Sequence, residues 1–192
     1  MIDYITGQIV ELNPTYVVVE TAGIGYFINI SLFTFEQIKD KKDVKLFVHQ
    51  IIREDSFTLY GFSTKDERDI FRLLISVSGI GAATARLMLS SLSPDEIRMA
   101  IVQADVQLIK SVKGIGLKTA QRIIVDLKDK VDIKQKDTVV LESSTNRDEA
   151  MEALVVLGFN RKAVEKAVNK VLKENPQASV ELIIKQAFKF LT

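Results

Sequence analysis

Apolar and polar residues alternate along the first third of the chain. β-Branched and aromatic side chains dominate residues 4–30, and the turn signals Asn-Pro from residue 13 and Gly-Ile-Gly from residue 23 divide this stretch. Two further β-rich runs, VKLFVHQII and FTLYGF, follow the polar sequence KDKKD. Alternation with a period of about two residues is typical of strands, so the pattern predicts about five strands before residue 63.

Five short strands within about 60 residues favour a small closed antiparallel barrel, because closure pairs every sheet edge. We therefore predict an OB-fold barrel over residues 1–63, with an SH3-like barrel as the alternative. OB-fold barrels often bind nucleic acid.

The apolar period becomes helical in residues 64–131. The sequence KDERDIFRLLISV places four apolar residues at helical spacing: Ile70, Leu73, Leu74 and Val77. Ser93 is a typical helix N-cap, with Pro94 at the first helical position and Glu96 completing a capping box. Asp105 is the expected cap of a short helix, and the stretch KTAQRIIVDLKDKV predicts a longer one. This region is expected to be entirely α-helical.

The last part of the chain is polar first and helical afterwards. Residues 132–146 have no sustained period, which predicts a flexible linker. Residues 147–192 contain three helical patterns, separated by Gly-Phe-Asn from residue 158 and by Asn-Pro from residue 175. We expect a small three-helix domain there.

Composition narrows the classes of function. The 192 residues contain no Cys and one His, His49, which leaves few candidates for metal ligands or for a Ser/His/Asp or Cys/His catalytic arrangement. We expect no metal and no cofactor, and a packed strand position for His49. Neither a membrane helix nor a secretory signal is recognisable, and the lack of Cys fits a reducing compartment, so a cytoplasmic location is expected.

Charge is distributed unevenly although the formal net charge is only +1. Residues 1–62 hold 5 basic and 8 acidic side chains, whereas residues 63–131 hold 11 basic and 8 acidic ones. The basic excess is modest, so any contact with nucleic acid must be concentrated at a few sites.

A duplicated motif lies within the basic region. SVSGIGAATARLML begins at Ser76, and SVKGIGLKTAQRII begins at Ser111. In each copy a Gly-Ile-Gly separates two helical patterns, so glycine can supply an unusual backbone angle while the Ile anchors the turn in the core. The free amides of the following helix and the positive end of its dipole then form an anion site. Lys113, Lys118 and Arg122 surround the second copy, and together they indicate phosphate binding without reading of bases.

Other glycine-rich motifs do not fit the spacing. A dinucleotide fingerprint requires a preceding strand and a third small residue, where this chain has helices and the threonines Thr84 and Thr119. A P-loop requires contiguous Gly-Lys-Ser/Thr, but Leu117 interrupts it. A purely structural helix-turn-helix duplication is the remaining alternative.

The two motif copies resemble a pair of helix-hairpin-helix motifs, and the order of barrel, hairpins, linker and three-helix tail is similar to the RuvA family of Holliday junction-binding proteins. Further supports are GIGY, REDSFTLYGF, KDERDIFRLL, KTAQRIIVDLKDK and, in the tail, ALVVLGF. Hairpins alone occur in many DNA repair proteins, so the ordered set carries the resemblance, which covers nearly the whole chain.

The resemblance implies a non-catalytic subunit that binds a four-way junction as a homotetramer, with one tetramer or two (an octamer) left open. It implies an acidic pin at Glu54 and Asp55, whose carboxylates repel phosphates and help to separate strands. Without the resemblance, these acids are typical of a solvated hairpin tip. The expected DNA contacts are Gly79, Gly81, Thr84, Gly114, Gly116, Lys118, Thr119 and Arg122.

The tail, by the same resemblance, is a UBA-like domain that docks on the ATP-driven ring motor RuvB. Its contact residues map onto Leu154, Leu157 and Phe159, although apolar residues at this spacing are as typical of a core. The resolvase RuvC is expected to meet the subunit only through the shared junction.

The chain departs from the family pattern at three places. Ala82 and Ala83 stand where relatives can carry a Lys, and Leu117 precedes Lys118, so phosphate contacts there rest more on backbone amides. Asp3 stands where a basic residue is often found, which puts DNA contact by the barrel in question.

Two other functions stay open from the sequence. A nuclease or glycosylase needs a carboxylate cluster or a base-flipping pocket, and the acids here are scattered. A generic single-strand-binding protein needs a platform of exposed aromatic rings, whereas the barrel aromatics are expected to face the core or are ambiguous. We predict that Gly114→Ala with Gly116→Ala abolishes junction binding and leaves a folded protein.

Overall fold

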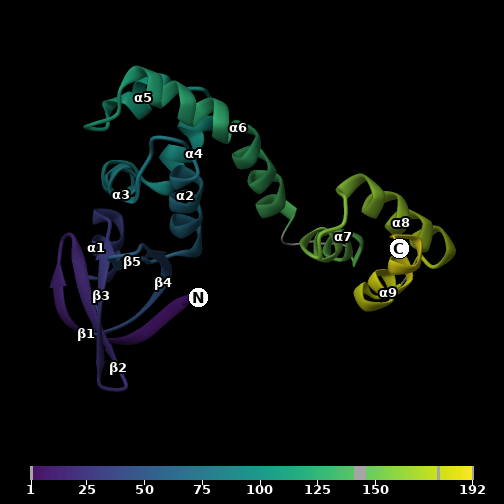
Figure 1. Ribbon diagram of the computed structural model, residues 1–192, viewed down its shortest axis with the longest axis horizontal. Coiled ribbons are helices and arrows are strands. Elements are labelled where there is room, and N and C mark those ends of the chain that lie inside the picture. The colour runs from purple at the N-terminus through teal and green to yellow at the C-terminus, as the bar shows by residue number, and fades with distance from the viewer. Residues whose placement is uncertain (1, 141–145, 177, 192) are drawn as a thin grey trace. The chain divides into compact units, whose positions relative to one another are not determined.

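The structure is a computed structural model that describes residues 2–140, 146–176 and 178–191, with the backbone alone over 132–140. The chain divides into two compact units, Met1–Ile133 and Lys134–Thr192 (Figure 1). The first unit holds a β-barrel and the helices that follow it, and the second holds the helices of the tail.

The barrel contains the five strands that the sequence predicts. Their order around the closed barrel is β1-β2-β3-β5-β4, and all neighbours are antiparallel except β3 and β5. Their bounds are β1 (Tyr4–Asn13), β2 (Tyr16–Thr21), β3 (Ile24–Ile30), β4 (Asp43–Ile52) and β5 (Phe57–Phe62). The predicted five-stranded barrel is therefore confirmed.

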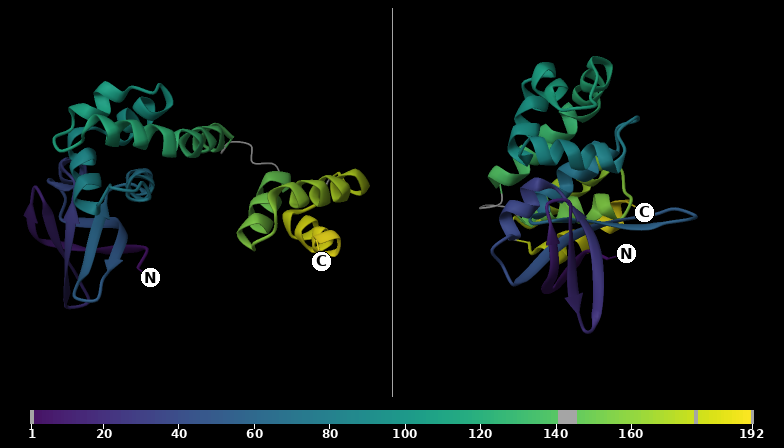
Figure 2. Two further views of the ribbon diagram at one scale, coloured as in Figure 1. Left: turned by 45° about the horizontal axis from the view of Figure 1, so that its top comes forward. Right: turned by 90° about the vertical axis from the view of Figure 1, so that its left-hand side faces the viewer.

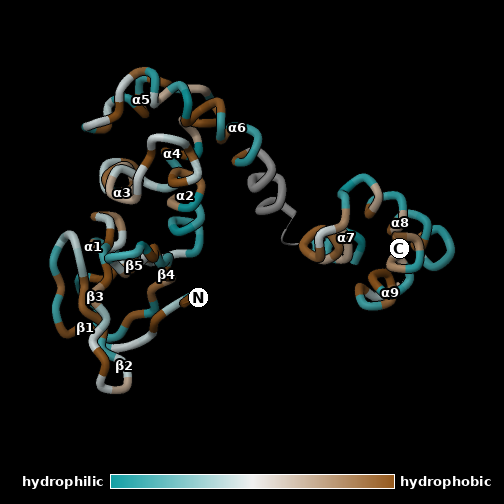
Figure 3. Tube along the Cα trace, in the orientation of Figure 1, coloured by the Kyte–Doolittle hydropathy of each residue, from teal (hydrophilic) through white to brown (hydrophobic). Residues whose placement is uncertain are grey.

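Alternation along the strands fills the barrel with β-branched and leucine side chains. Hydrophobic and less hydrophobic positions follow one another along these strands in Figure 3. The buried residues include Ile5, Val17, Val19, Ile28, Leu46 and Val48. Every second side chain of a strand points to the same face, so the intervening residues form the outer surface of the barrel.

The β2–β3 connection differs in detail from its prediction. The two-residue turn consists of Ala22 and Gly23, both at positive φ (51° and 78°), and Ile24 already pairs with Thr21. Positive φ at both turn residues matches the twist of antiparallel strands, which explains the glycine. The expected turn signal from residue 23 thus lies partly within β3.

A short helix, α1 (Leu32–Ile38), lies between β3 and β4 and is not among the predicted elements. Ser31 caps it by accepting a hydrogen bond from the Thr34 amide at 3.0 Å. Ser31 before the apolar run LFTF is a helix N-cap signal in the sequence. The β-rich runs on both sides of it favoured strands instead.

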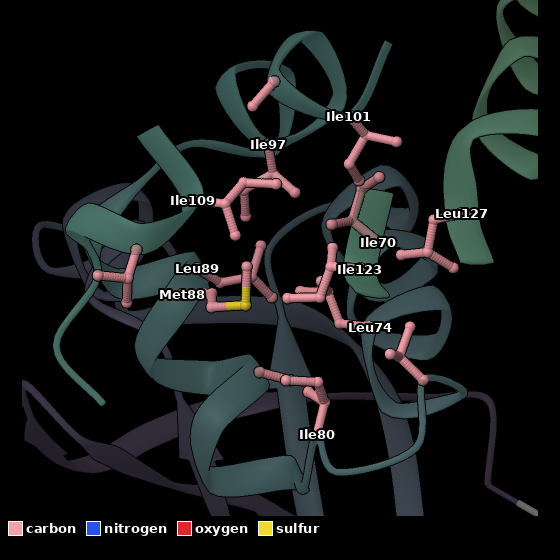
Figure 4. Packing of buried hydrophobic residues seen from close by; sticks show 14 of the residues in the cluster. Ile70, Leu74, Ile80, Met88, Leu89, Ile97, Ile101, Ile109, Ile123 and Leu127 are labelled. Carbon is pink, nitrogen blue, oxygen red and sulfur yellow. The ribbon is translucent and has the colours of Figure 1, made fainter. Parts of the chain in front are cut away.

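The remaining helices of the first unit form one core above the barrel. They are α2 (Lys65–Ile75), α3 (Ala82–Ser91), α4 (Pro94–Val102), α5 (Val106–Ser111) and α6 (Leu117–Val140). Figure 4 shows side chains from all five helices converging, among them Ile70, Leu89, Ile97, Ile109 and Ile123.

The predicted N-caps of this region are confirmed, but the last helix extends beyond its predicted end at residue 131. Ser93 and Glu96 form the reciprocal capping box, and Asp105 accepts from the Leu108 amide at 3.0 Å. However, α6 continues past Val131, so the stretch predicted as a linker from residue 132 begins as helix. Residues 141–145 of that predicted linker lie outside the described residues.

Aromatic rings join the helices to the barrel. Phe71 of α2 packs against Phe62, Tyr60 and His49 of the β4–β5 outer face, with ring centroids 4.9, 5.2 and 5.6 Å apart. The His49 ring is partly buried there, as expected, and burial lowers its pKa together with the nearby Arg72 and Arg68 charges. The barrel and α2 therefore share an aromatic interface.

Polar contacts reinforce this attachment. Arg86 of α3 donates to the Thr15 carbonyl at 3.0 Å and to Asn29 Oδ1 at 3.1 Å. Glu67 of α2 is fully buried and accepts hydrogen bonds from Ser31 and Thr34 of the barrel unit. Polar partners at separate points fix the orientation of α2 and α3 on the barrel.

The second unit is the predicted three-helix domain. It contains α7 (Asn146–Val156), α8 (Arg161–Glu174) and α9 (Val180–Leu191). Its core includes Leu154, Val164, Val168, Val171 and Ile183. In the described part of the chain, no helix combines the length and apolar character needed to cross a membrane.

Candidate nucleic-acid interface

The two motif copies fold into the same backbone geometry. In the first, the Ile80 amide donates to the Val77 carbonyl at 3.0 Å; in the second, the Ile115 amide donates to the Val112 carbonyl at 3.1 Å. Gly79 and Gly114, the first glycines of the two motifs, have φ of 92° and 88°. This left-handed conformation strains residues with a Cβ, so the duplicated glycine has a backbone reason.

The isoleucine between the glycines anchors each turn, as predicted. Ile80 is 4% exposed and Ile115 is 5% exposed, and both belong to the core shared by α2 to α6. Because both turns are held by one core, their positions relative to each other are fixed.

Each motif ends in a helix that begins after a glycine, a residue with no side-chain oxygen to cap it. Gly81 is the N-cap of α3 and makes no side-chain cap hydrogen bond. Gly116 has the corresponding place before α6, where its carbonyl accepts from the Ala120 amide at 2.9 Å. The amides of the first helical turn have no acceptor within their own helix, so these ends remain free for an external acceptor.

The other helix starts of the first unit are capped differently. Side-chain oxygens of Ser31, Thr64, Ser93 and Asp105 accept from the first turns of α1, α2, α4 and α5. Glycine therefore stands at the two starts that belong to the duplicated motif, while oxygen-bearing side chains stand at the neighbouring ones. A glycine N-cap offers no side-chain oxygen to the first amides of its helix, so these two starts meet a condition that anion binding requires.

The surface over the glycines is open. A Cβ atom built on any of the glycines Gly79, Gly81, Gly114 and Gly116 meets no other atom within 4 Å. A ligand can thus approach the backbone at both turns.

Basic side chains surround the second hairpin. Lys113 and Lys118 are exposed. Arg122 donates from Nη1 to the Ser78 carbonyl of the first hairpin at 3.2 Å. Arg122 therefore connects the two hairpins, a role that its sequence position did not reveal, while its other N–H groups can face a phosphate.

Thr84 and Thr119 are half-buried in the first turns of α3 and α6. They occupy equivalent positions after the matching glycines, whereas Lys118 and Arg122 lie on α6 and correspond to Ala83 and Leu87 in the first copy. Backbone amides dominate the first turn, which carries no lysine beside its glycines.

The predicted acidic pin lies at the tip of the β4–β5 hairpin. Glu54 and Asp55 are exposed, and the Arg53 amide closes the turn by donating to the Ser56 carbonyl at 2.8 Å. The hairpin projects from the barrel in the right-hand view of Figure 2. The carboxylates thus stand clear of the barrel.

Asp3, the acid that departs from the family pattern, is occupied within the protein. Its carboxylate lies 2.6 Å from Nη1 of Arg68, whose side chain is 7% exposed. The same nitrogen donates to the Asp3 carbonyl at 2.8 Å. Asp3 therefore secures the first residues of the barrel to α2, and its charge is largely offset.

The predicted docking residues of the tail divide between core and surface. Leu154 is fully buried and supports the domain from within. Phe159 is half-buried against Phe188, with ring centroids 5.3 Å apart. Leu157 is 60% exposed, and Val156, which is not among the predicted docking residues, is 80% exposed. The exposed apolar surface thus lies at the end of α7.

Among residues 2–131, 146–176 and 178–191, no group of three or more His, Cys, Asp or Glu side chains is arranged to hold a metal ion.

Three family models match successive parts of the chain. The RuvA N terminal domain matches residues 1–61, the SAM-like helix-hairpin-helix tandem matches residues 71–129, and the RuvA C-terminal domain matches residues 145–192. Their order agrees with the barrel, the hairpins and the three-helix unit.

Proteins named Holliday junction branch migration complex subunit RuvA match the full length. The one from Christiangramia forsetii is 56% identical, and the one from Flavobacterium psychrophilum is 54% identical. The one from Bacteroides thetaiotaomicron is 48% identical, and all three alignments cover 100% of both chains.

Proposed function

The chain belongs to the RuvA family as a non-catalytic subunit of the Holliday junction branch migration complex, and from this we propose that its hairpins hold the arms of a four-way DNA junction. A separate ATPase ring, RuvB, supplies the work of branch migration. The subunit acts in the cytoplasm, where bacterial chromosomal DNA lies.

The observation that supports this proposal best is the pair of uncapped helix starts at Gly81 and Gly116, fixed by one core. Amides at a helix N-terminus bind phosphate without contacting a base. Two such sites at a fixed separation select a backbone geometry rather than a sequence. A fourfold arrangement of subunits, in one tetramer or two, matches the four arms of a junction.

Native gel binding to a four-way junction against linear duplex of the same arms, with Mg²⁺ and excess competitor, tests this function. We expect preference for the junction in discrete complexes that contain tetramers. Equal affinity for both DNAs contradicts junction recognition, and strand cleavage or base release by the protein alone would identify an enzyme instead.

Neutralising the acidic tip tests its part in this preference. Glu54→Gln with Asp55→Asn removes two exposed negative charges that repel phosphates. We expect affinity for linear duplex to rise by about tenfold at low salt, so that the preference for the junction falls, because like charges at an interface suppress wrong partners.

The same gel assay measures this effect. Glu20→Gln with Asp40→Asn removes two exposed acids elsewhere on the barrel and is the matched control. An equal rise in duplex affinity for both double variants would assign the effect to net charge and reject the pin.

The exposed end of α7 is the proposed docking surface for RuvB. Val156→Asp with Leu157→Asp places charges on side chains that are 80% and 60% exposed. We expect affinity for RuvB to fall about tenfold or more, because a buried charge disfavours an apolar contact, while junction binding stays unchanged.

Pull-down or biosensor binding with purified RuvB measures the change. Phe190→Asp alters another exposed apolar residue of the same unit, 45% exposed, and serves as the control. If RuvB still binds the Val156→Asp, Leu157→Asp variant but no longer binds the Phe190→Asp variant, the docking surface lies on α9 instead. RuvC needs no contact of its own with this surface if it meets the subunit through the junction.

A further inference from the structure

A group of aromatic and lysine side chains lies on the outside of the barrel, where the hairpins and the acidic tip do not use it. Tyr4, Lys45, Phe47 and Lys65 form this basic-aromatic patch. Tyr4 is 52% exposed, although the barrel aromatics were expected to face the core or to be ambiguous.

Strand pairing builds the patch. Tyr4 of β1 is the direct partner of Phe47 in β4, and Thr6 is the partner of Lys45. Directly opposite residues share a face, and Lys45 lies two residues from Phe47 on that face. The intervening Ile5 and Leu46 are in the core, so the register directs the patch outward.

Cations are held against the rings. Nζ of Lys45 lies 4.1 Å from the Tyr4 ring centroid and 5.6 Å from that of Phe47. Nζ of Lys65, at the start of α2, lies 5.7 Å from the Phe47 centroid. The ring quadrupole attracts an ammonium and leaves its charge available, so the lysines are positioned without being neutralised.

Two of the nearby acids are paired with other bases. Asp3 makes an ion pair with Arg68, and Asp66 makes one with Arg98. Lys45 and Lys65 have no ion-pair partner within the described part of the chain. The two lysines of the patch therefore lie beside an exposed ring without an ion pair of their own, and the exposed Asp43, two residues from Lys45 on the same strand face, reduces the net charge of the patch to about +1.

The neighbouring part of the same barrel face is covered. Phe71 of α2 packs over His49, Tyr60 and Phe62, whereas the patch continues the face beyond this contact. Strand β4 then runs on to the acidic tip, and the distance from Phe47 to Ile52, five residues further along the strand, is about 17 Å at about 3.3 Å per residue.

We propose that the basic-aromatic patch binds an unpaired segment of DNA strand, with Lys45 and Lys65 on its phosphates and a base stacked on Tyr4. Aromatic rings bind bases only when the base faces are accessible, and lysines beside them bind the backbone. Duplex DNA keeps its bases stacked, so this site selects single strand. The inference extends the proposed function, because strand exchange opens base pairs near the crossover.

Fluorescence anisotropy of the full chain with labelled oligo(dT) of about 12 nucleotides tests the patch, across a range of salt concentrations. We expect Lys45→Gln with Lys65→Gln to weaken binding and to lower the slope of log K against log salt by about 1.4, or about 0.7 per lysine. Tyr4→Leu should weaken binding by roughly 5- to 160-fold with little change in the slope, because it removes the stacking ring and leaves both lysine charges in place.

Lys41→Gln removes one exposed barrel lysine outside the patch and is the matched control, run also with Lys42→Gln. Failure of the wild-type chain to bind oligo(dT), or equal losses in the control pair, would overturn the patch assignment. A changed oligomeric state of the patch variants by light scattering would assign it to subunit contact instead. Loss of oligo(dT) binding with the oligomeric state unchanged leaves junction binding by the hairpins intact, so native gels of the same variants with the four-way junction show which of the two proposals fails.

Discussion

Gly81→Ala combined with Gly116→Ala should weaken binding to a four-way junction by about 100-fold or more while the protein stays folded. The added methyl groups extend into open space beside the uncapped amides of α3 and α6. Hydrogen bonds to a charged partner contribute roughly 1.5–3 kcal/mol each, so disturbing one at both sites accounts for a loss of this size. Anisotropy with labelled junction measures the affinity, and circular dichroism verifies the fold.

The choice of glycine decides whether this experiment can be interpreted. Gly79 and Gly114 have positive φ, so alanine there strains the backbone by about 1–2 kcal/mol and can weaken binding by moving the turn. The sequence-based variant pair, Gly114→Ala with Gly116→Ala, therefore combines a strained position with an unstrained one. Gly81 and Gly116 avoid the strain because neither lies in the left-handed region.

A control glycine on the barrel completes the design. A Cβ atom at Gly25 meets only the Val18 side chain at 3.4 Å, which is ordinary contact, so Gly25→Ala should bind the junction like the wild type. If the Gly81→Ala, Gly116→Ala variant bound the junction as tightly as the wild type, the helix amides would not be DNA contacts, and the lysines would be the remaining contacts.

The hairpins could be predicted from sequence because their determinants are local. A glycine that needs positive φ, a buried isoleucine and a second glycine before a helix recur after 35 residues, and backbone geometry follows this short pattern. The strands and caps were also predictable, since alternation and capping depend on neighbours in the chain.

Features that depend on distant partners could not be predicted in the same way. Arg122 bonds to Ser78, and Asp3 bonds to Arg68, across separations that no local pattern encodes. The exposure of Tyr4 depends on where α2 covers the barrel. In the tail, a helical spacing cannot tell that Leu154 is in the core and Leu157 is on the surface.

Two helix starts with the same capping-box spacing fold differently, and they show most clearly what a local pattern cannot predict. Thr64 and Glu67 at the start of α2 have the same spacing as Ser93 and Glu96 at the start of α4. The Glu96 carboxylate is exposed and accepts hydrogen bonds from the Ser93 amide at 2.8 Å and from the Ser93 hydroxyl at 2.9 Å. These two bonds lower the pKa of Glu96. Glu67 instead turns into the barrel interface, and burial raises its pKa although hydrogen bonds oppose the shift.

Replacing Glu67 by Ala should therefore lower the free energy of unfolding of the first unit by about 3 kcal/mol. The carboxylate accepts from Ser31, from Thr34 at 2.6 Å and from the Ser63 amide at 3.2 Å. Ser31 and Thr34 are fully buried, and each buried donor left without an acceptor costs roughly 1–3 kcal/mol. Urea unfolding measures the loss, and Glu96→Ala, which removes the exposed glutamate of the same pattern, should have a smaller effect.

The pH dependence separates the charge of Glu67 from its packing. In the unfolded chain this carboxyl ionises near its ordinary pKa of 4.5, whereas the folded protein holds the proton to higher pH. The unfolded state then binds fewer protons in that interval, so the contribution of Glu67 to stability is greatest below pH 4.5 and decreases as pH rises through the raised pKa. Glu67→Gln cannot titrate, so the stability of the wild type relative to this variant should fall as pH rises from about 5 to about 8. A constant difference across that range would mean that the four-donor environment of Glu67 offsets its burial, and the carboxylate would then be charged throughout.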